Sequence, residues 1–180
     1  NRIFFRSVIG NKVGVSSSNS PVASDLIKAM DDSYDIAMTQ PEKKDFAGLP
    51  KPGKYKELDT FDDSTASFSP MDRAKKVKGI IKKANAKKFE VAGAFATSIG
   101  EIAVVNSNGV QAHQPFTSAA TNMVVMSDNS SGYASDTSRR VTDIDFDHLA
   151  DVAVDKCYRS QNPISIEPGD YEVILEPAAI

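Results

Sequence analysis

The feature that most constrains the fold is the stretch of residues 89–127, which is poor in charge and rich in Val, Ala, Thr, Ser and Phe. Asn108-Gly109 lies inside it between two extended runs, and Asn-Gly is the pair that best tolerates the positive φ angles of a type I′ turn. We therefore predict a β-hairpin at this pair. With a further turn at residues 98–101 and a break at Pro115, the prediction becomes a four-strand antiparallel meander. Its strands are Phe89–Thr97, Glu101–Asn106, Val110–Gln114 and Ser118–Met126.

Three amphipathic segments are predicted to be the helices that cover this sheet, because so apolar a sheet needs cover on at least one face. The first starts at Ser20-Pro21, with a buried stripe of Val22, Leu26, Ala29, Ser33 and Ile36. The second starts at Ser69-Pro70, with a stripe of Ala74, Val77, Ile81 and Ala84. The third is capped by Asp143 or Asp145, with a stripe of Phe146, Leu149, Ala150, Ala153 and Cys157.

The remaining segments complete an α+β prediction. Loose alternation around Gly10-Asn11 predicts an N-terminal hairpin, and Tyr171–Leu175 is predicted to be a C-terminal strand. Residues 40–67 and 128–140 are predicted to be loops, because they are rich in Pro, Gly, Ser and charge. Strands grouped apart from helices favour an antiparallel α+β fold over a doubly wound parallel sheet. We treat residues 1–180 as one region, with a subdivision into residues 1–67 and 68–180.

The charge, cysteine content and hydropathy of the chain limit the classes of function that it can have. The formal net charge of −3 gives no field that would recruit nucleic acid or an anionic membrane. The single cysteine, Cys157, excludes an internal disulfide framework and fits a reducing cytoplasm. No apolar run approaches the length of a membrane span, and no secretory signal is visible. The sequence starts without Met and both ends interrupt predicted elements, so we expect a fragment of a longer protein.

The sequence contains no recognisable catalytic or metal-binding motif: HExxH, CxxC, GxSxG, GxGxxG and the phosphate-binding GxxxxGK[ST] are all absent. His113, His148 and Cys157 do not have the spacing of a metal site, and we expect structural or surface roles for them. The residues alone therefore predict no catalytic residue, no metal ligand and no cofactor in this chain.

The second predicted helix carries a lysine-rich face, which raises the hypothesis of a nucleic-acid-associated regulator acting through residues 71–88. No aromatic residues are interleaved for stacking on bases, and no Asn, Gln or Arg array is available to read base edges. We therefore favour a solvated lysine face over nucleic-acid binding. The basic residues concerned are Arg73, Lys75, Lys76, Lys78, Lys82, Lys83, Lys87 and Lys88.

Four motifs, in this order along the chain, resemble the TldD/PmbA family, also called modulators of DNA gyrase. The segment 102–110 (IAVVNSNGV) is similar to the family's IAxxNSxGL hairpin. The segment 131–134 (SGYA) is similar to its SGWA loop. The resemblance ends with residues 160–163 (SQNP) and with residues 167–179 (EPGDYEVILEPAA), which are similar to its PGxYxVVLEPxA strand.

The resemblance implies part of a cytoplasmic zinc metallopeptidase system that degrades unfolded or leader peptides. One family member carries an HExxxH zinc motif beyond the strand that corresponds to Tyr171–Leu175, and it pairs with a related member that lacks the metal. No zinc ligand can be assigned to any residue present here. The LEPAA ending looks more like the PmbA (TldE) branch than the TldD branch. An alternative is that the longer protein is itself the active peptidase, with HExxxH beyond residue 180.

The resemblance also suggests where this chain would act. A peptidase must hold extended substrates, and a sheet edge does this through main-chain hydrogen bonds with little sequence preference. The predicted loop after the meander could contact a peptide substrate or a related TldD/PmbA subunit in a homo- or heterodimer. The candidate residues are Ser131, Gly132, Tyr133, Arg139 and Arg140, with Tyr133 as an aromatic surface and the arginines as carboxylate partners.

Overall fold

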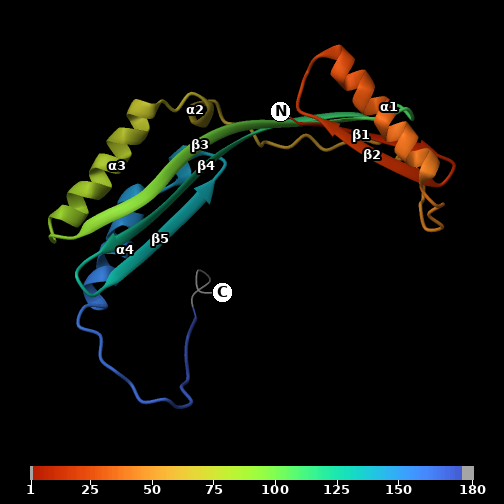
Figure 1. Ribbon diagram of the computed structural model, residues 1–180. Coiled ribbons are helices and arrows are strands. Elements are labelled where there is room, and N and C mark those ends of the chain that lie inside the picture. Colours follow the sequence, from red (N-terminus) through yellow and green to blue (C-terminus); the bar gives the residue numbers. More distant parts are fainter. Residues whose placement is uncertain (1, 176–180) are drawn as a thin grey trace. The chain divides into compact units, whose positions relative to one another are not determined.

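The computed structural model describes residues 2–175 and divides the chain into two compact units (Figure 1). Unit 1 comprises Asn1–Lys54 and Val105–Gln111, and unit 2 comprises Tyr55–Val104 and Ala112–Ile180. The predicted subdivision at residues 67 and 68 falls inside unit 2.

Unit 1 contains a two-stranded antiparallel sheet and one helix. Strands β1 (Ile3–Ile9) and β2 (Lys12–Ser18) pair in a register that brings Ile9 opposite Lys12, as the predicted N-terminal hairpin requires. Gly10 has a φ of +58°, which glycine adopts without steric penalty. Helix α1 (Ala23–Thr39) packs across both strands.

The contact between α1 and the sheet is made by small residues. A Cβ atom at Gly14 would overlap with Ser33 O and Ala37 N, so the helix backbone lies directly on β2. Ala29, Ser33 and Ala37 are buried there, and the hydroxyls of Ser33 and Ser7 are hydrogen-bonded at 2.6 Å. Close approach replaces the large apolar side chains that usually fill a helix–sheet interface.

Two details of this helix were predicted wrongly. The helix begins at Ala23 after Val22, without a side-chain cap, so Ser20 is not the N-cap. The buried stripe includes Ala29 and Ser33 as predicted, but it continues to Ala37, and both ends of the predicted stripe are exposed. Small residues set this stripe because only they allow the close contact at Gly14.

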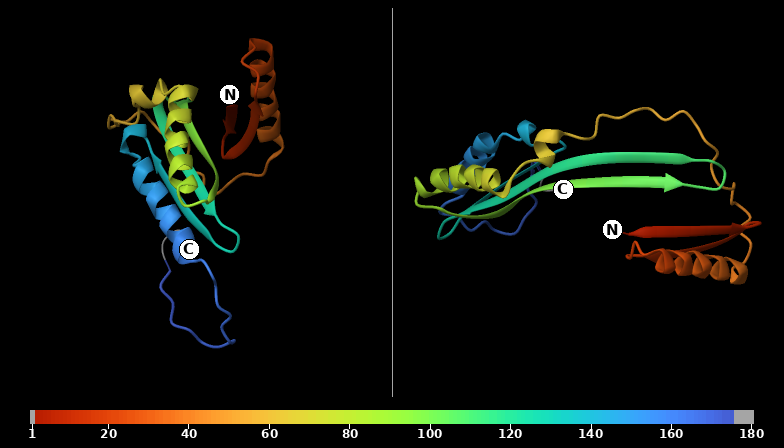
Figure 2. Two further views of the ribbon diagram at one scale, coloured as in Figure 1. Left: turned by 90° about the vertical axis from the view of Figure 1, so that its left-hand side faces the viewer. Right: turned by 90° about the horizontal axis from the view of Figure 1, so that it is seen from above.

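Unit 2 contains a three-stranded antiparallel sheet in the order β3-β4-β5, with helices packed on one face (Figure 2). The strands are β3 (Glu90–Val105), β4 (Gln111–Met126) and β5 (Ser131–Ser138). The helices are α2 (Asp63–Ala66), α3 (Pro70–Asn85), the 3-10 turn η1 (Val141–Asp143) and α4 (Phe146–Arg159). The α+β class and the antiparallel centre are confirmed.

The strand boundaries of the predicted meander are wrong. Instead of four short strands, β3 and β4 each run for 16 residues, and residues 98–101 form no turn. Gly100 lies in β3 with the ring of Phe116 packed over it from β4, so this glycine accommodates an aromatic neighbour. Pro115 is tolerated within β4 because β5 pairs only with residues 119–126, which leaves β4 an edge at Pro115.

The hairpin at Asn108-Gly109 is confirmed, but the turn is not type I′. Gly109 has a φ of +93°, whereas Asn108 is not among the residues with positive φ. Gly109 N donates to Asn106 O at 3.1 Å, and Asn106 Oδ1 accepts from the amides of Asn108 and Val110 at 3.0 Å each. These bonds define a three-residue loop, in which a type I turn is followed by a left-handed glycine.

The predicted cap of α3 is confirmed, and of the two candidate caps of α4, Asp143 and Asp145, the structure has Asp145. Ser69 Oγ accepts from Asp72 N at 3.2 Å, and Asp145 Oδ1 accepts from His148 N at 2.9 Å. On α4 the predicted residues Phe146, Ala150, Ala153 and Cys157 are buried. On α3 the buried positions are Ile80 and Ala84, whereas Ile81 is 41% exposed, so that stripe was predicted only in part.

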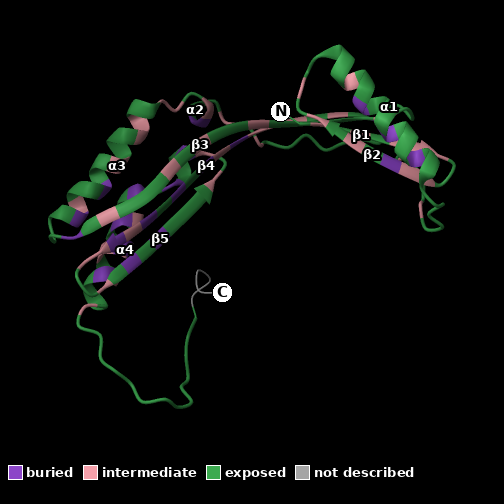
Figure 3. Cartoon of the chain, viewed as in Figure 1, coloured by how far each residue is buried: buried purple, intermediate pink, exposed green. Residues whose placement is uncertain are grey.

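The core of unit 2 lies between these two helices and one face of the sheet. Figure 3 shows that most of the buried positions of the sheet lie on β4 and β5, whereas β3 is largely exposed. An aromatic chain runs through this core: the rings of Phe95 and Phe146 lie 4.7 Å apart, and those of Phe68 and Phe95 lie 5.9 Å apart. The buried apolar residues from the sheet are Ala119, Met123, Val125 and Ala134, and Phe89 is buried just before β3.

Two further predictions need correction. Tyr171–Leu175 forms no strand, because the described residues offer it no pairing partner. The predicted polar loop at residues 128–140 contains β5 instead. Residues 176–180, which end the LEPAA motif, lie outside the described residues.

Candidate functional site

Strand β5 lies at an edge of the sheet and contains three of the five predicted contact residues. Among residues 2–175 it pairs with β4 alone, in the sheet order β3-β4-β5. The sequence of β5 is rich in Gly, Ser and Asp, which have low β-propensity, and a loop was predicted for this reason. In a sheet, side-chain packing can outweigh this intrinsic propensity. The signal that could have identified it is alternation: Gly132 and Ala134 are buried, whereas Tyr133, Ser135 and Thr137 are exposed.

The main-chain groups of alternate β5 residues point away from β4. Ser127 N donates to Ser130 O at 3.0 Å, so these two residues form a hydrogen-bonded pair. In an antiparallel ladder such pairs alternate with pairs whose main-chain groups point away from each other, which tells which β5 residues face β4. Ser131 O accepts from Ser160 Oγ at 3.0 Å, and Thr137 N donates to Asp136 Oδ1 at 2.8 Å, so both of these groups face outward. Between them, Tyr133 and Ser135 direct their amide and carbonyl groups toward the open edge.

Gly132 serves the packing of α4 rather than the surface. A Cβ atom at this position would overlap with Ala153 O and would lie 2.5 Å from Cys157 N. Gly132 is buried accordingly. Tyr133 lies on the other face of the sheet, opposite Val124 on β4, and is 44% exposed. Of these two neighbours, only Tyr133 offers side-chain surface to a ligand.

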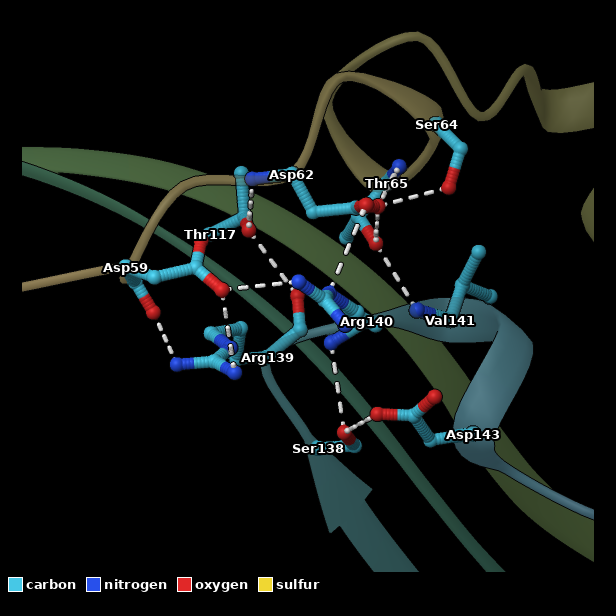
Figure 4. A network of polar contacts seen from close by, with 10 residues as sticks. All are labelled: Asp59, Asp62, Ser64, Thr65, Thr117, Ser138, Arg139, Arg140, Val141 and Asp143. Carbon is cyan, nitrogen blue, oxygen red and sulfur yellow. Dashed lines mark hydrogen bonds and ion pairs between the residues drawn. The ribbon is translucent and has the colours of Figure 1, made fainter.

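Arg139 and Arg140 lie just beyond β5 and hold the segment that precedes α2 (Figure 4). Arg140 Nη2 lies 2.7 Å from Asp59 Oδ2, and Arg139 Nη1 donates to Asp59 O. The Arg139 carbonyl accepts from Thr117 Oγ1 at 2.9 Å. Arg139 Nη2 also lies 3.5 Å from Asp59 Oδ2, so both guanidinium groups already have a carboxylate partner from their own chain, and a peptide carboxylate would compete with Asp59.

Asp62 is the hydrogen-bonding centre of the same network. Its Oδ2 accepts from Ser64 Oγ at 2.6 Å and from both the amide and the hydroxyl of Thr65 at 2.7 Å. The hydrogen bond from Ser64, followed by those from Thr65, lowers the pKa of Asp62 below its ordinary value of 3.8. Thr65 Oγ1 in turn accepts from Val141 N at 2.7 Å, which ties α2 to η1.

The predicted contact residues therefore fall into two groups. Ser131 and Tyr133 begin β5, whereas Arg139 and Arg140 follow its end, about 20 Å farther along an extended chain. One short ligand group cannot touch both, but an extended peptide of six to eight residues lying along β5 could. The role of Asp59 as the arginines' partner was not predictable, because it lies 80 residues earlier in the chain.

Most of the basic residues of α3 have partners. Lys75 pairs with Asp72 at 2.9 Å, and Lys83 pairs with Asp151 at 2.8 Å and Asp147 at 3.2 Å. Lys76 lies over the ring of Phe146, and Arg73 Nη1 donates to Phe68 O. Lys87, just beyond the end of α3, lies over the ring of Tyr158. These contacts weaken the hypothesis of a nucleic-acid-binding face.

The histidines and the cysteine lie on separate elements. His113 on β4 has its Nε2 3.0 Å from Glu101 Oε2, His148 is exposed on α4, and Cys157 is fully buried beside Ser130. Within residues 2–175, no three His, Cys, Asp or Glu side chains form a group that could hold a metal ion. The described residues therefore do not fit a zinc site. In the same range, no helix has both the length and the apolar character to span a membrane.

The fold is shared with several solved structures, three of which are described next. TldE from Thermococcus kodakarensis is 24% identical with a TM-score of 0.72, over 85% of this chain and 36% of that chain. A proposed modulator of a DNA gyrase from Thermotoga maritima is 12% identical, with a TM-score of 0.77 over 91% and 38% of the two chains. A proposed modulator of DNA gyrase from Bacteroides thetaiotaomicron is 16% identical, with a TM-score of 0.76 over 90% of this chain and 40% of that chain.

The present chain thus spans less than half the length of these structures. A comparison with curated protein sequences found no match. The sequence model of the PmbA/TldA metallopeptidase central domain matches residues 60–160, which is more than half of the chain. That match covers α2, α3, the three-stranded sheet and α4, so the part of the structure that carries the candidate site is the matched part. The chain therefore belongs to the PmbA/TldD family of metallopeptidase components.

Proposed function

We propose that this chain is a non-catalytic part of a PmbA/TldD-type metallopeptidase, in which the edge of β5 holds an extended peptide. The observation that carries the proposal is the pair of outward main-chain groups at Tyr133 and Ser135. A strand added to this edge would be held by main-chain hydrogen bonds, which any sequence can make. Such an edge suits a peptidase component that must accept varied unfolded chains.

The side chains around the edge support a short, extended ligand. Ser160 Oγ already donates to the Ser131 carbonyl, and the Asp136 carboxylate already accepts from the Thr137 amide. The stretch of β5 edge between these two groups, which a ligand strand could pair with, is therefore short. Tyr133 offers an aromatic surface on one face. Arg139 and Arg140, which are 44% and 41% exposed, could take a peptide carboxylate in exchange for Asp59.

The catalytic metal belongs elsewhere in this proposal. The described residues do not fit zinc, so the cutting residues would be supplied by a longer form of the protein or by a related subunit. We place the assembly in the cytoplasm and its partner in the same family, as a homo- or heterodimer, with the PmbA (TldE) branch favoured by the LEPAA ending. The rival function is that the longer protein is itself the zinc peptidase.

A peptide-binding measurement tests the proposed edge. The probe is an uncharged ten-residue Ser/Thr/Val peptide, and amide hydrogen exchange of the 180-residue chain is the readout. We expect the amides of Tyr133 and Ser135 to gain protection. Ser135→Pro removes the outward N–H and should abolish this protection, whereas Ser135→Ala keeps it and should bind normally. Equal binding by both variants would overturn the proposal.

Metal analysis separates the two rival functions. Purified with zinc present, the 180-residue chain should hold far less than one equivalent and should leave a fluorogenic peptide uncut. Stoichiometric zinc bound through His113 or His148 would overturn the non-catalytic assignment. If the longer protein alone binds zinc and cuts peptide, the rival function is correct and this chain is its substrate-holding part.

A further inference from the structure

The two arginines beyond β5 hold the Asp59 carboxylate through only one of its oxygens (Figure 4). Arg140 Nη2 lies 2.7 Å from Asp59 Oδ2, and Arg139 Nη2 lies 3.5 Å from the same atom. A guanidinium group binds a carboxylate most strongly when two parallel N–H donors reach its two oxygens. Asp59 therefore leaves part of the donor capacity of both arginines for a better-placed carboxylate.

The exposure of this ion pair makes the Asp59 carboxylate exchangeable. The Asp59 side chain is 62% exposed, and both arginine side chains are exposed by more than two-fifths. An ion pair between exposed groups adds little net stability, because water solvates the separated charges almost as well. A second carboxylate that comes close to the arginines can therefore replace Asp59 at little cost.

Asp62, the other carboxylate beside Arg140, is not exchangeable in this way. Its Oδ2 accepts hydrogen bonds from Ser64 and Thr65, which hold it at the start of α2. Its Oδ1 lies 3.9 Å from Arg140 Nε, which is too far for a hydrogen bond. Asp59 is therefore the carboxylate that a ligand would displace.

The segment that carries Asp59 is fixed to β4 by bonds that do not involve the Asp59 carboxylate. Thr117 N donates to Thr60 O at 3.0 Å, and Thr60 Oγ1 donates to Pro115 O at 2.7 Å. Asp62 N donates to Thr117 Oγ1 at 3.0 Å. The Asp59 side chain can therefore turn away from the arginines while the main chain of its segment stays in place.

The arginines also follow the open edge of β5 at a defined distance. Arg139 comes four residues after Ser135 and Arg140 comes five, which corresponds to about 13 Å and about 17 Å of extended chain. A peptide paired with Tyr133 and Ser135 would bring a carboxylate four or five residues farther along to these side chains. A C-terminal carboxylate arrives there only if the peptide runs in the direction of β5, whereas an acidic side chain arrives in either direction.

We propose that Arg139 and Arg140 form a carboxylate subsite for the peptide held on β5, and that Asp59 occupies this subsite while no peptide is bound. The inference rests on the proposed function and names the class of peptide that the edge prefers. That class is an extended chain with a carboxylate four or five residues beyond the paired stretch. Asp59 is an internal competitor, so the preference is the difference between two similar carboxylates and is modest.

Three ten-residue Ser/Thr/Val peptides test the subsite on the 180-residue chain by isothermal titration calorimetry. All are N-acetylated: the first ends in an amide, the second in a free carboxylate, and the third in an amide with one Glu at its eighth position. At low salt, a carboxylate probe should bind about two- to fivefold more tightly than the first probe. A gain for the second probe alone assigns a C-terminal carboxylate and a peptide parallel to β5. A gain for the third admits an acidic side chain, and no gain for either overturns the proposal.

Asp59→Asn tests the internal competitor, because here the removal of a residue should improve binding. The variant should bind the carboxylate probe about two- to fivefold more tightly than the wild type and should bind the first probe equally well. Glu57→Gln, which removes the same charge from an exposed position two residues earlier, is the matched control and should change neither affinity. Arg140→Gln should remove the preference for a carboxylate, and circular dichroism checks the folding of each variant. An equal gain in Asp59→Asn and Glu57→Gln, or weaker carboxylate binding in Asp59→Asn, would refute the competitor.

The subsite and the peptide edge can fail separately. If the first probe protects the amides of Tyr133 and Ser135 from hydrogen exchange but a carboxylate adds no affinity, the edge is supported and the subsite is wrong. If no probe protects these amides while the carboxylate probes still bind more tightly to Asp59→Asn, the arginine site is supported and the peptide edge is wrong.

Discussion

Both units lay a helix across a strand at a glycine, yet they stabilise this contact differently. In unit 1 the glycine is Gly14, which contacts the backbone of α1 at Ser33 and Ala37. In unit 2 it is Gly132, which contacts the backbone of α4 at Ala153 and Cys157. In each case the helix presents small residues, because a larger side chain would hold the two backbones apart.

The difference lies in what surrounds the contact. Beside Gly132, the rings of Phe95 and Phe146 and the side chains of Met123 and Val125 form an extended apolar core. The described part of unit 1 buries the small residues Ala29, Ser33 and Ala37, together with Val110 at the hairpin. Hydrophobic stabilisation grows with the apolar area removed from water, so unit 2 has a core of its own, whereas unit 1 depends on close contact and hydroxyl bonds.

The largest expected effect tests whether the aromatic core belongs to unit 2 alone. Phe146→Ala removes a buried ring and should cost about 3–5 kcal/mol of unfolding free energy. Hydrogen exchange should show lost protection in α4 and β5, with α1 and β2 unchanged. Phe4→Ala, at a position that is 65% exposed, is the control and should change the unfolding free energy little. Equal loss of protection in both units would show that they unfold together.

The paired glycines sharpen the comparison. Gly14→Ala and Gly132→Ala both force a Cβ atom into a helix backbone, an overpacking that costs about 1–3 kcal/mol or more. In unit 2 the surrounding core should keep α4 docked despite the strain. In unit 1 we expect α1 to lose its protection from hydrogen exchange entirely. If Gly14→Ala proves the milder of the two, close packing is not what holds unit 1 together.

Acid should weaken only unit 2 through Asp62. Because its pKa is lowered in the folded state, the cap contributes stability above pH 3.8 that is lost as the pH falls through the lower folded value. The difference in unfolding free energy between the wild type and Asp62→Asn should therefore shrink from about pH 5 to about pH 3. Urea titrations at several pH values measure it, with Asp63→Asn as the control. A difference that does not change with pH would contradict the role of the Asp62 carboxylate.

The smallest expected effect has the opposite sign. Gly79 lies exposed on α3, and a Cβ atom there would meet nothing within 4 Å. Gly79→Ala should therefore stabilise unit 2 by about 0.5–1 kcal/mol, because glycine loses more backbone entropy than alanine in a helix. Thermal unfolding measures the change. If Gly79→Ala instead lowers the unfolding temperature, the added methyl group must clash with another residue, contrary to the open surroundings of Gly79 in this structure.

By itself, the sequence determined the features that depend on neighbouring residues. Caps and apolar periodicity located α3 and α4, with Ser69 as the N-cap of α3 and either Asp143 or Asp145 as that of α4, and Gly10 and Gly109 located both hairpins. The four motifs also identified the family. These signals are local, since a cap or a left-handed glycine acts within four residues of itself.

Tertiary structure decided what depends on distant residues. Packing against α4 made β5 a strand despite its weak propensity, and the ring of Phe116 allowed β3 to continue through Gly100. The pairing of Arg140 with Asp59 joins positions 81 residues apart in sequence. No local pattern encodes such contacts, because each is favourable only once the chain has brought its two partners together.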